Sequence, residues 1–316
     1  MSLKKIAIGI DIGGTNIELA WVKPDGSIIK NLSYKTADFP QVEMFVEEIG
    51  NAIISINKEL SSFEITGIGI GAPNGNYFTG SIEFAPNLKW EGKIELAKLF
   101  EQKTSLPTKL TNDANAAAFA EKLFGGAKQM KNFLVVTLGT GLGSGIFVNG
   151  EMLYGSTGFA GELGHTTAIE SGRKCGCGKK GCLETYASAT GIVKTAKEFL
   201  ALSKVNSLIT ETENFEAKDI FIAAQNGDKL AFETIKYTGE ILGKSLADYV
   251  ALFSPEAIFL TGGLAKAHSL LIPETEKAMN KNMLKIFKET VKILPSSLIE
   301  QNAGLLGAAA LVMSNI

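Results

Sequence analysis

Three cysteines lie within one short stretch of the sequence and could bind a metal ion together. They are Cys175, Cys177 and Cys182, and the chain of 316 residues contains no other cysteine. Three thiolates this close suit zinc, but a structural zinc site needs four nitrogen or sulfur ligands. His165 lies ten residues before Cys175, whereas the only other histidine, His268, is distant in the sequence. The spacing therefore predicts a structural Cys3His zinc site; three reduced thiols in a glycine-rich loop are the alternative.

Two glycine-rich segments could bind phosphate groups. One reads DIGGTN over residues 11–16, and the other reads LGTGLGSG over residues 138–145. Glycines let a backbone approach an anion closely and point its N–H groups toward it. Neither segment is a Walker A loop or a dinucleotide fingerprint, because a strand follows each turn and no Gly-Lys-Ser/Thr ending is present. Together the segments predict the binding of one phosphate chain; ordinary glycine hairpins are the alternative.

The predicted nucleotide contacts extend beyond these glycines. Thr15 and Asn16 add hydrogen-bond donors, and Asp11 could hold Mg²⁺ directly or through water. A third turn, TGG at 261–263, could lie against an adenosine, or could be a plain turn between a strand and a helix. The residues predicted to contact the nucleotide are Asp11, Gly13, Gly14, Thr15, Asn16, Gly139, Thr140, Gly141, Gly262 and Gly263.

Asn112 and Asp113 follow a predicted strand and open an alanine-rich helix. Both residue types are common at helix N-termini, where they accept hydrogen bonds from free backbone N–H groups. Phosphoryl transfer also needs a group that accepts the proton of the attacking hydroxyl, and a carboxylate does this in kinases. From the residues alone, helix capping and catalysis both stay open for Asp113.

These residues need a scaffold of strands and helices, which the apolar periodicity predicts. Alternating or continuous apolar runs indicate strands, and apolar residues spaced three and four apart indicate helices. The predicted strands are 6–10, 17–22, 27–35, 65–70, 108–111, 133–138, 146–148 and 257–260; the predicted helices are 41–60, 94–100, 192–202, 228–252 and 304–313; and 202–217 is a predicted loop.

The same plan occurs twice along the chain. Residues 6–26 and 133–150 both read as a strand, a turn rich in glycine and threonine, a second strand and a tight turn. Proline-Asp-Gly closes the first copy and Asn-Gly closes the second, and both are hairpin signals. This internal duplication predicts two similar α/β lobes, each presenting a glycine-rich turn to a shared cleft.

Composition and charge restrict the class of protein. The chain has 31 Lys and Arg against 33 Asp and Glu, so the net charge of −2 gives no support for a nucleic-acid or anionic-membrane partner. The apolar run at 6–10 is too short for a signal peptide, and no run approaches the ~20 apolar residues of a membrane span. Three cysteines cannot all pair, which argues against a secreted disulfide scaffold. We expect a cytoplasmic protein.

The motifs together are typical of one family. In order, the chain contains DIGGTN, ND at 112–113, LGTGLGSG, GSTGFAGELGH at 155–165 and CGCGKKGCLE at 175–184. This combination resembles the ROK family, in the actin/hexokinase/Hsp70-like ATPase superfamily, and more narrowly its bacterial glucokinase-type sugar kinases. The resemblance covers residues 6–313, and its most specific part is GELGH followed by the cysteine cluster. Ser144 stands where glycine is more usual, a mild departure because serine is small.

The resemblance implies a fold and a division of the chain. It implies an α/β protein with two ribonuclease-H-like (actin-like ATPase) lobes around a central cleft. The predicted N-terminal lobe comprises 1–111 and is rejoined by the C-terminal helix 302–316. The predicted C-terminal lobe comprises 112–301 and includes the zinc loop, defined here as residues 165–184.

The resemblance also implies roles for individual residues. Asp113 is the expected catalytic base, and the backbone of Gly71 is expected to line the sugar pocket. The same four zinc ligands are implied, and one imidazole nitrogen of His165 is then left to face the sugar. Trp90 is expected to pack in the core. The residues implied to contact the sugar are Gly71, Asn87, Asn112, Asp113, Glu162, His165 and Glu184.

The implied function is ATP-dependent phosphorylation of the 6-hydroxyl of a hexose, with glucose as the leading candidate. ATP with Mg²⁺ and a structural Zn²⁺ are the expected cofactors, and a homodimer is the expected assembly. The alternatives are a kinase for N-acetylmannosamine, fructose or another hexose, and a non-catalytic, sugar-sensing ROK protein. A DNA-binding repressor is disfavoured, because the first phosphate motif begins at Asp11 and leaves no room for a preceding helix-turn-helix.

Overall fold

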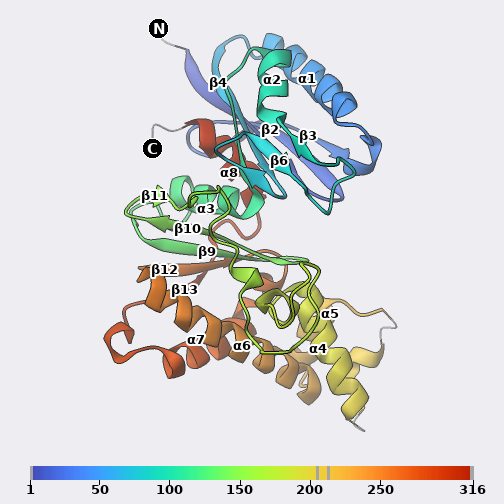
Figure 1. The fold of residues 1–316 in the computed structure, drawn as a ribbon, viewed down its shortest axis with the longest axis vertical. Helices are drawn as coiled ribbons and strands as arrows, with labels where there is room; N and C mark the ends of the chain where they lie inside the picture. Colours follow the sequence, from blue (N-terminus) through green and yellow to red (C-terminus); the bar gives the residue numbers. More distant parts are fainter. Residues whose placement is uncertain (1–2, 204–205, 212–213, 314–316) are drawn as a thin grey trace. The chain divides into compact units, whose positions relative to one another are not determined.

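The computed structural model describes residues 3–203, 206–211 and 214–313, which divide into two compact units (Figure 1). Unit 1 takes its described residues from Met1–Gln129, Met152–Ala160 and Glu300–Ile316, and unit 2 takes them from Met130–Glu151 and Gly161–Ile299. The C-terminal helix thus packs with the N-terminal part of the chain. The lobe boundaries predicted at residues 111–112 and 301–302 stay predictions; residues 112–129 group with unit 1 by their contacts.

Unit 1 is built on a five-stranded mixed sheet with the order β3-β2-β1-β4-β8. Strand β2 pairs antiparallel with β1 and β3, whereas β1, β4 and β8 run parallel. Each strand overlaps one that the sequence predicted. Their bounds are β1 (Lys4–Ile12), β2 (Asn16–Val22), β3 (Ile28–Lys35), β4 (Phe63–Ala72) and β8 (Thr108–Asn112).

Four α-helices cover the faces of this sheet. Helices α1 (Val42–Glu59) and α2 (Leu96–Thr104) contribute Phe45 and Phe100, among others, to the core with the strands. Trp90 belongs to the same core: its ring centre lies 5.0 Å from that of Phe45, and its Nε1 donates to Phe39 O at 2.9 Å. The expectation that Trp90 is a packing residue is therefore confirmed.

Helix α8 (Ala303–Met313) packs closely against β1 and β4, and helix α3 (Asp113–Leu123) packs against α8. The close approach requires glycine on both sides of α8. A Cβ on Gly69 would lie 1.7 Å from Ala308 O, and a Cβ on Gly307 would lie 1.6 Å from Ala116 O. These two glycines therefore allow close backbone contact of α8 with β4 and with α3.

A small three-stranded sheet accompanies unit 1, with β5 (Gly75–Asn76), β6 (Ser81–Glu83) and β7 (Lys93–Ile94). The prediction of a helix over 94–100 was wrong at its start, because Ile94 pairs with Ile82 and helix α2 begins at Leu96. Strands of two or three residues are too short to leave a periodic pattern in the sequence.

Unit 2 is built on a second five-stranded sheet with the order β11-β10-β9-β12-β13. Strand β9 pairs antiparallel with β10 and parallel with β12, which pairs parallel with β13. The bounds are β9 (Phe133–Leu138), β10 (Leu142–Val148), β11 (Glu151–Met152), β12 (Ala257–Thr261) and β13 (Lys292–Pro295). The predicted strand at 146–148 begins earlier, because Leu142 already pairs with Leu138. The glycine turn is thus limited to residues 139–141.

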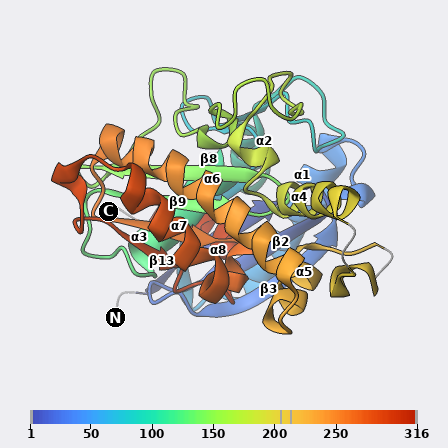
Figure 2. The same ribbon diagram turned by 90° about the horizontal axis from the view of Figure 1, so that it is seen from below.

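The helices of unit 2 are α4 (Ala189–Leu202), α5 (Ala217–Gln225), α6 (Lys229–Phe253) and α7 (His268–Asn282), with α6 packed along α7 and also contacting α4 and α5 (Figures 1 and 2). The predicted loop at 202–217 contains a 3₁₀ turn, and its residues 204–205 and 212–213 lie outside the described residues. Among the described residues, the 3₁₀ helices are η1 (Thr36–Asp38), η2 (Leu163–His165), η3 (Leu183–Thr185), η4 (Leu208–Glu211), η5 (Leu264–Ala267) and η6 (Lys285–Phe287).

The two sheets confirm the duplication inferred from the sequence. In each, a central strand pairs antiparallel with the strand that follows it and parallel with a strand that comes after a helix. In each, the glycine-rich turn joins the antiparallel pair. The class is α/β, as predicted.

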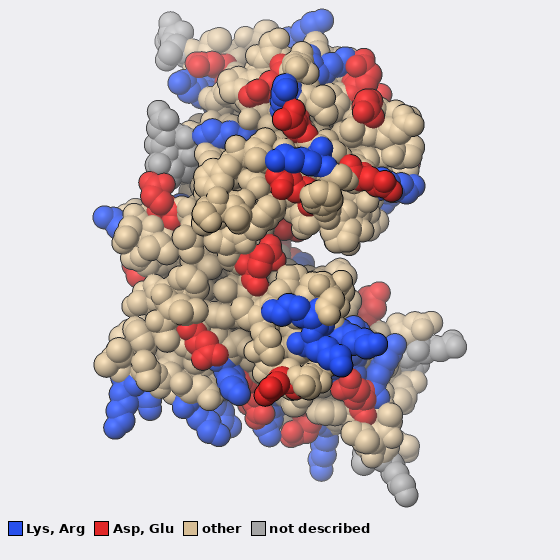
Figure 3. All heavy atoms as spheres, in the orientation of Figure 1, with Lys and Arg blue, Asp and Glu red and all other residues tan. Residues whose placement is uncertain are grey.

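Neither the surface charge nor the apolar helices of the described residues point to a special class of partner. Basic and acidic side chains are mixed on the face drawn in Figure 3, in line with the net charge of −2. Within the described part of the chain, no helix combines the length and the apolar character needed to cross a membrane.

Candidate functional site

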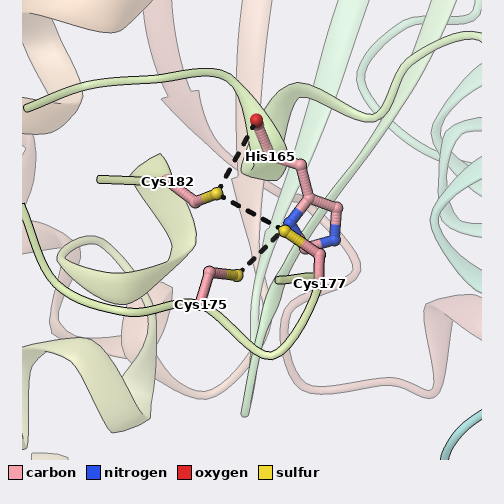
Figure 4. A group of neighbouring side chains, drawn as sticks. All are labelled: His165, Cys175, Cys177 and Cys182. Atoms are coloured by element: carbon pink, nitrogen blue, oxygen red, sulfur yellow. Dashed lines mark hydrogen bonds between the residues drawn. The ribbon is translucent and has the colours of Figure 1, made fainter. Parts of the chain in front are cut away.

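The four predicted zinc ligands lie together in unit 2 (Figure 4), with all their ligand atoms within 4.8 Å of one another. Cys175 Sγ is 3.6 Å from His165 Nδ1, and Cys177 Sγ is 3.6 Å from Cys182 Sγ. A tetrahedral zinc with bonds of about 2.0–2.3 Å requires separations of about 3.5–3.8 Å between its ligand atoms. The cluster therefore has the dimensions and the donor set of a Cys3His zinc site.

Burial disfavours the thiolate form at two of the three cysteines. Burial raises the pKa of Cys182 to about 12 and also raises the pKa of Cys175. The pKa of Cys177 is lowered, chiefly because the backbone N–H of Lys179 donates to its sulfur. Thiolates are the metal-binding form of cysteine, so a divalent cation would offset the burial that disfavours them. The residues present thus fit zinc.

Tight turns give the zinc loop its shape. The Cys175 N–H donates to Lys179 O at 2.9 Å, and the Gly178 N–H donates to Cys175 O at 3.1 Å. Gly178 and Gly181 adopt φ values of +90° and +76°, which L side chains rarely adopt. Gly181 also has no room for a side chain, because a Cβ would lie 1.7 Å from Ile169 O. The glycines of the motif therefore allow the cysteines to converge.

Arg173 fastens this loop to the elements that follow it, and the sequence motif did not single it out. Its guanidinium donates to Thr185 O at 2.7 Å and to Thr195 Oγ1 at 2.9 Å, and it pairs with Glu198. The same group lies over the ring of Tyr186, 4.4 Å from the ring centre, and its side chain is only 12% exposed. An arginine two residues before the first cysteine was the only available signal for this role.

The two ring nitrogens of His165 face different surroundings. Its Nδ1 faces the sulfur cluster, and its Nε2 lies 4.0 Å from the Glu162 carboxylate. Glu162 is exposed, and the His165 side chain is 34% exposed. The imidazole therefore leaves one nitrogen for a ligand outside the cluster, as the sequence predicted for a sugar contact.

Glu184 links the zinc loop to the second glycine turn, residues 139–141. Its Oε2 accepts a hydrogen bond from the Leu142 N–H at 3.0 Å, and its Oε1 lies 3.7 Å from Cys175 Sγ. A Cβ on Gly141 would lie 2.4 Å from that Oε2. The structure thus places a predicted sugar ligand directly against a predicted phosphate turn.

Helix α4 and strand β12 also border this turn. The Ala189 N–H donates to Gly139 O at 2.8 Å, and Thr190 Oγ1 donates to Thr140 O at 2.9 Å. At the end of β12, Gly262 has φ +91°, and a Cβ there would lie 2.8 Å from the Leu138 backbone. Gly263 is exposed, with open space around it. The two predicted nucleotide turns of unit 2 therefore meet at one edge of its sheet.

In unit 1, predicted site residues meet where the parallel strands end. Asp11 of β1 is paired with Gly71 of β4, which is paired with Thr111 of β8, one residue before Asn112. Carboxyl ends of parallel strands are a common place for ligand binding in α/β folds. Gly71 is buried, and a Cβ there would lie 3.2 Å from the Ala116 side chain. Gly71 therefore packs closely against α3, and the contact of its backbone with the sugar stays a prediction.

Asn112 and Asp113 occupy the N-terminus of α3. Asn112 is the N-cap: its Oδ1 accepts from the Asn115 N–H at 2.7 Å. Asp113 Oδ1 accepts from the Ala114 N–H at 2.8 Å. Desolvation raises the pKa of Asp113, although its side chain keeps access to solvent, and backbone hydrogen bonds oppose the rise. The capping interpretation thus holds for Asn112 and leaves the Asp113 carboxylate accessible.

Asp11 lies beside Asp113 and the start of α8. Burial raises the pKa of Asp11 to about 6, and repulsion from Asp113 and Glu18 adds to the rise, whereas a hydrogen bond from Asn302 opposes it. Gly304 leaves room for this carboxylate, since a Cβ there would lie 2.8 Å from Asp11 Oδ2. Asn302 was not predicted, because nothing local in the sequence ties it to a residue almost the whole chain away.

The first glycine turn carries exposed donors. Gly14, Thr15 and Asn16 are all exposed, and the Asn16 side-chain oxygen accepts from Lys35 Nζ at 2.8 Å. A Cβ on Gly14 would lie 3.3 Å from Asn87 O, so a predicted sugar contact adjoins this turn. Gly13 helps to close the turn, since its N–H donates to Asn16 O at 2.9 Å.

The predicted site residues therefore form two groups, one on each unit. Unit 1 carries Asp11, Gly13, Gly14, Thr15, Asn16, Gly71, Asn87, Asn112 and Asp113; unit 2 carries Gly139, Thr140, Gly141, Glu162, His165, Cys175, Cys177, Cys182, Glu184, Gly262 and Gly263. Both groups combine a glycine turn with carboxylates; the unit 1 group adds amide side chains, and the unit 2 group adds an imidazole and three thiols. Such groups suit phosphate on one hand and hydroxyl groups on the other.

Comparisons with known proteins agree with this chemistry. A model of the ROK family matches residues 7–315. A glucokinase of Halalkalibacterium halodurans is 38% identical over 275 residues, covering 84% of this chain and 82% of the relative. A xylose repressor of Bacillus subtilis is 29% identical over 312 residues, covering 98% of this chain and 77% of the relative.

A solved structure has the same fold. The ROK family glucokinase from Streptomyces griseus, in complex with glucose and AMPPNP, matches with a TM-score of 0.80 and 32% identity. The match covers 97% of this chain and 98% of that chain. It confirms the predicted fold class, two ribonuclease-H-like units of the actin-like ATPase type.

Proposed function

The chain belongs to the ROK family, and on that basis we propose that it is an ATP-dependent hexose kinase acting on the 6-hydroxyl, with glucose as its preferred substrate. One observation carries the proposal. A glucokinase solved with glucose and AMPPNP matches 97% of this chain, which itself has glycine turns and an accessible carboxylate at the ends of its strands.

Asp113 is the proposed catalytic base. The carboxylate accepts the proton of the 6-hydroxyl as that oxygen attacks the γ-phosphorus of ATP; the new O–P bond forms while the bond from phosphorus to the β-γ bridging oxygen breaks. Two features support this role: solvent access, and a pKa raised by desolvation, which makes the carboxylate a stronger base than an ordinary aspartate. The fixed position at the start of α3 orients it.

The glycine turns are the proposed phosphate contacts. The turn backbone is exposed at Gly14 and Thr15 in unit 1 and at Thr140 in unit 2, and N–H groups of such turns suit phosphate oxygens. Asp11 is the proposed Mg²⁺ ligand, directly or through water, because an oxygen donor next to phosphate is what this hard cation prefers. When bound, Mg²⁺ neutralises charge on the phosphates. Gly262 and Gly263 are the proposed adenosine contacts.

The hexose contacts combine carboxylates, amides and an imidazole. Carboxylates accept hydrogen bonds from sugar hydroxyls, often two at a time, and amide groups both donate and accept. The proposed contacts are Asn87, Asn112, Asp113, Glu162, His165 and Glu184. Zinc, held by His165 and the three cysteines, is proposed to be structural, because four protein ligands leave no open position.

The experiment that tests this function is an ADP-release assay on the purified protein with ATP and Mg²⁺, run across glucose, mannose, fructose, galactose, N-acetylmannosamine and N-acetylglucosamine. We expect turnover with glucose, and we expect glucose to have a higher kcat/KM than any other sugar in the panel. If another hexose has the highest kcat/KM, the proposed preference for glucose is wrong. If no sugar in the panel is turned over, the kinase assignment is refuted.

A non-catalytic, sugar-sensing protein is the second candidate, favoured by the similarity to a xylose repressor. The same assay separates the two, because a sensor binds sugar without releasing ADP. A homodimer and a cytoplasmic location stay predictions from the resemblance and from the cysteine count.

A further inference from the structure

We propose that the second glycine turn, residues 139–141, positions the Glu184 carboxylate and thereby sets hexose affinity as well as holding phosphate. The inference rests on the proposed function, because it assumes that Glu184 contacts the hexose. It makes the turn a shared part of two binding sites in unit 2.

The contact between Glu184 and the turn carries the inference. The backbone N–H of Leu142, the residue directly after the turn, donates to Glu184 Oε2 at 3.0 Å. Gly141 lies so close that a Cβ there would come within 2.4 Å of the same oxygen. The carboxylate is therefore seated in a space that exists only because residue 141 has no side chain.

The segment after Glu184 holds the turn from the other side. The Ala189 N–H donates to Gly139 O at 2.8 Å, and Thr190 Oγ1 donates to Thr140 O at 2.9 Å. Ser188 Oγ donates to the backbone O of Glu184 at 2.7 Å. Residues 184–190 and 139–142 thus form one hydrogen-bonded unit, so a shift of the turn moves Glu184.

A fixed position of the Glu184 carboxylate lowers the entropy lost when a polar ligand binds to it. A glutamate side chain has several rotatable bonds, and ordering it on binding costs conformational entropy. The Leu142 N–H occupies one lone pair of Oε2 and leaves acceptor positions on both oxygens for a hydroxyl. Preordering by the turn therefore raises hexose affinity without any contact between the turn and the sugar. Gly141 is a positioning residue in this sense.

Two glycines of unit 2 provide a matched pair of variants. Gly141→Ala places a methyl group against the flexible end of Glu184, which must move. Gly176→Ala places the same methyl group in open space at an exposed position, with nothing within 4 Å. Neither glycine has a φ in the left-handed region, so alanine is allowed by the backbone at both. Thermal unfolding checks that both variants fold.

The test is glucose binding without nucleotide, measured by isothermal titration calorimetry on the full-length, zinc-loaded protein. We expect Gly141→Ala to weaken glucose binding on the order of tenfold, the scale of one lost hydrogen bond to a charged group. We expect Gly176→Ala to stay within about twofold of wild type, since its methyl group touches nothing. In a Glu184→Ala background, Gly141→Ala should have no further effect, because the group it displaces is gone.

The outcomes separate the inference from the function beneath it. Equal glucose affinities for Gly141→Ala and wild type would overturn the inference and leave the kinase assignment intact. An undiminished effect of Gly141→Ala in the Glu184→Ala background would also overturn it. If the wild-type protein binds none of the sugars in the panel, the proposed function fails and the inference fails with it.

Discussion

Two aspartates define the chemistry of unit 1 at the scale of single residues: Asp11 lies near the end of β1, and Asp113 directly follows β8, which is separated from β1 by β4. Asp11 is pushed toward its protonated form by burial and by the charge of Asp113, and only Asn302 opposes this. Such perturbed carboxyl groups are common at functional sites, where a nearby cation restores the charged form. The raised pKa therefore agrees with a Mg²⁺ ligand and also has a consequence for stability.

Asp11 should make folding stability depend on pH. Its pKa rises from 3.8 to about 6 on folding, so the folded state binds more protons and its stability falls as the pH rises between these values. Asp11→Asn should leave stability at pH 4 nearly unchanged and increase it above pH 6 by as much as about 3 kcal/mol. Urea unfolding of both proteins at pH 4 and pH 7.5, without Mg²⁺, measures this. A variant that is less stable than wild type at pH 7.5 would contradict the assigned pKa.

The zinc loop is the element on which most of unit 2's proposed sugar contacts depend. Its glycines allow the cysteines to converge, and Arg173 ties it to η3 and α4. Glu184 follows the last cysteine by two residues, so the position of the metal ligands and the position of this carboxylate are linked. Loss of zinc should therefore reduce sugar binding through the loop, without removing a catalytic group.

Elemental analysis should find about one zinc per chain, as four ligands define a single site. Cys177→Ser should lower the zinc content and the thermal stability and raise the KM for glucose at least about tenfold, because one sulfur ligand is lost. Lys180→Ala, an exposed change in the same loop, serves as the control. Full activity in a preparation free of zinc would contradict a structural role for the metal.

Helix α8 needs a glycine where it packs against the backbone of α3. Gly307 lies against the backbone of α3, where a Cβ would meet Ala116 O at 1.6 Å. Backbone cannot yield as a flexible side chain does, so Gly307→Ala should destabilise the protein by about 3 kcal/mol or more. Gly263→Ala, which meets open space, should change stability little. Thermal unfolding of the two variants checks this, and equal midpoints would argue against the close packing of α3 on α8.

The sequence predicted the elements that carry long apolar patterns, and missed those that do not. Strand β1 and helix α6 follow from periodicity, but the two- and three-residue strands β5, β6 and β7 leave no such pattern. Helix α7 was not predicted, because it contains Pro273 and its apolar face is weak. Segment 142–145 was read as turn because of its glycines, whereas pairing with β9 makes it strand.

The site was predictable where chemistry is concentrated in local motifs. The zinc ligands were found by counting donors, and the structure brings all four together. Arg173, Asn302 and the Leu142 N–H were not predicted, because their roles depend on contacts between distant segments or on backbone groups that the sequence does not distinguish. The burial of Gly71 likewise follows from its place between two other strands.

At the scale of the whole molecule, the duplicated sheet explains why the site residues are divided between two units. Each unit places one glycine turn between an antiparallel strand pair, beside a parallel strand that follows a helix. Unit 1 adds the aspartates, and unit 2 adds the zinc loop. We propose that these parts together transfer a phosphoryl group from ATP to a hexose, with Asp113 as the base.

The role of Asp113 is measured by the initial rate of ADP release with saturating ATP, Mg²⁺ and glucose, for wild type and for Asp113→Asn. The amide keeps the size of the side chain but cannot accept the hydroxyl proton, so kcat should fall on the order of a thousandfold or more, with thermal stability and ATP binding retained. Product analysis should locate the phosphate on the 6-hydroxyl. Turnover by Asp113→Asn within about tenfold of wild type would contradict the account.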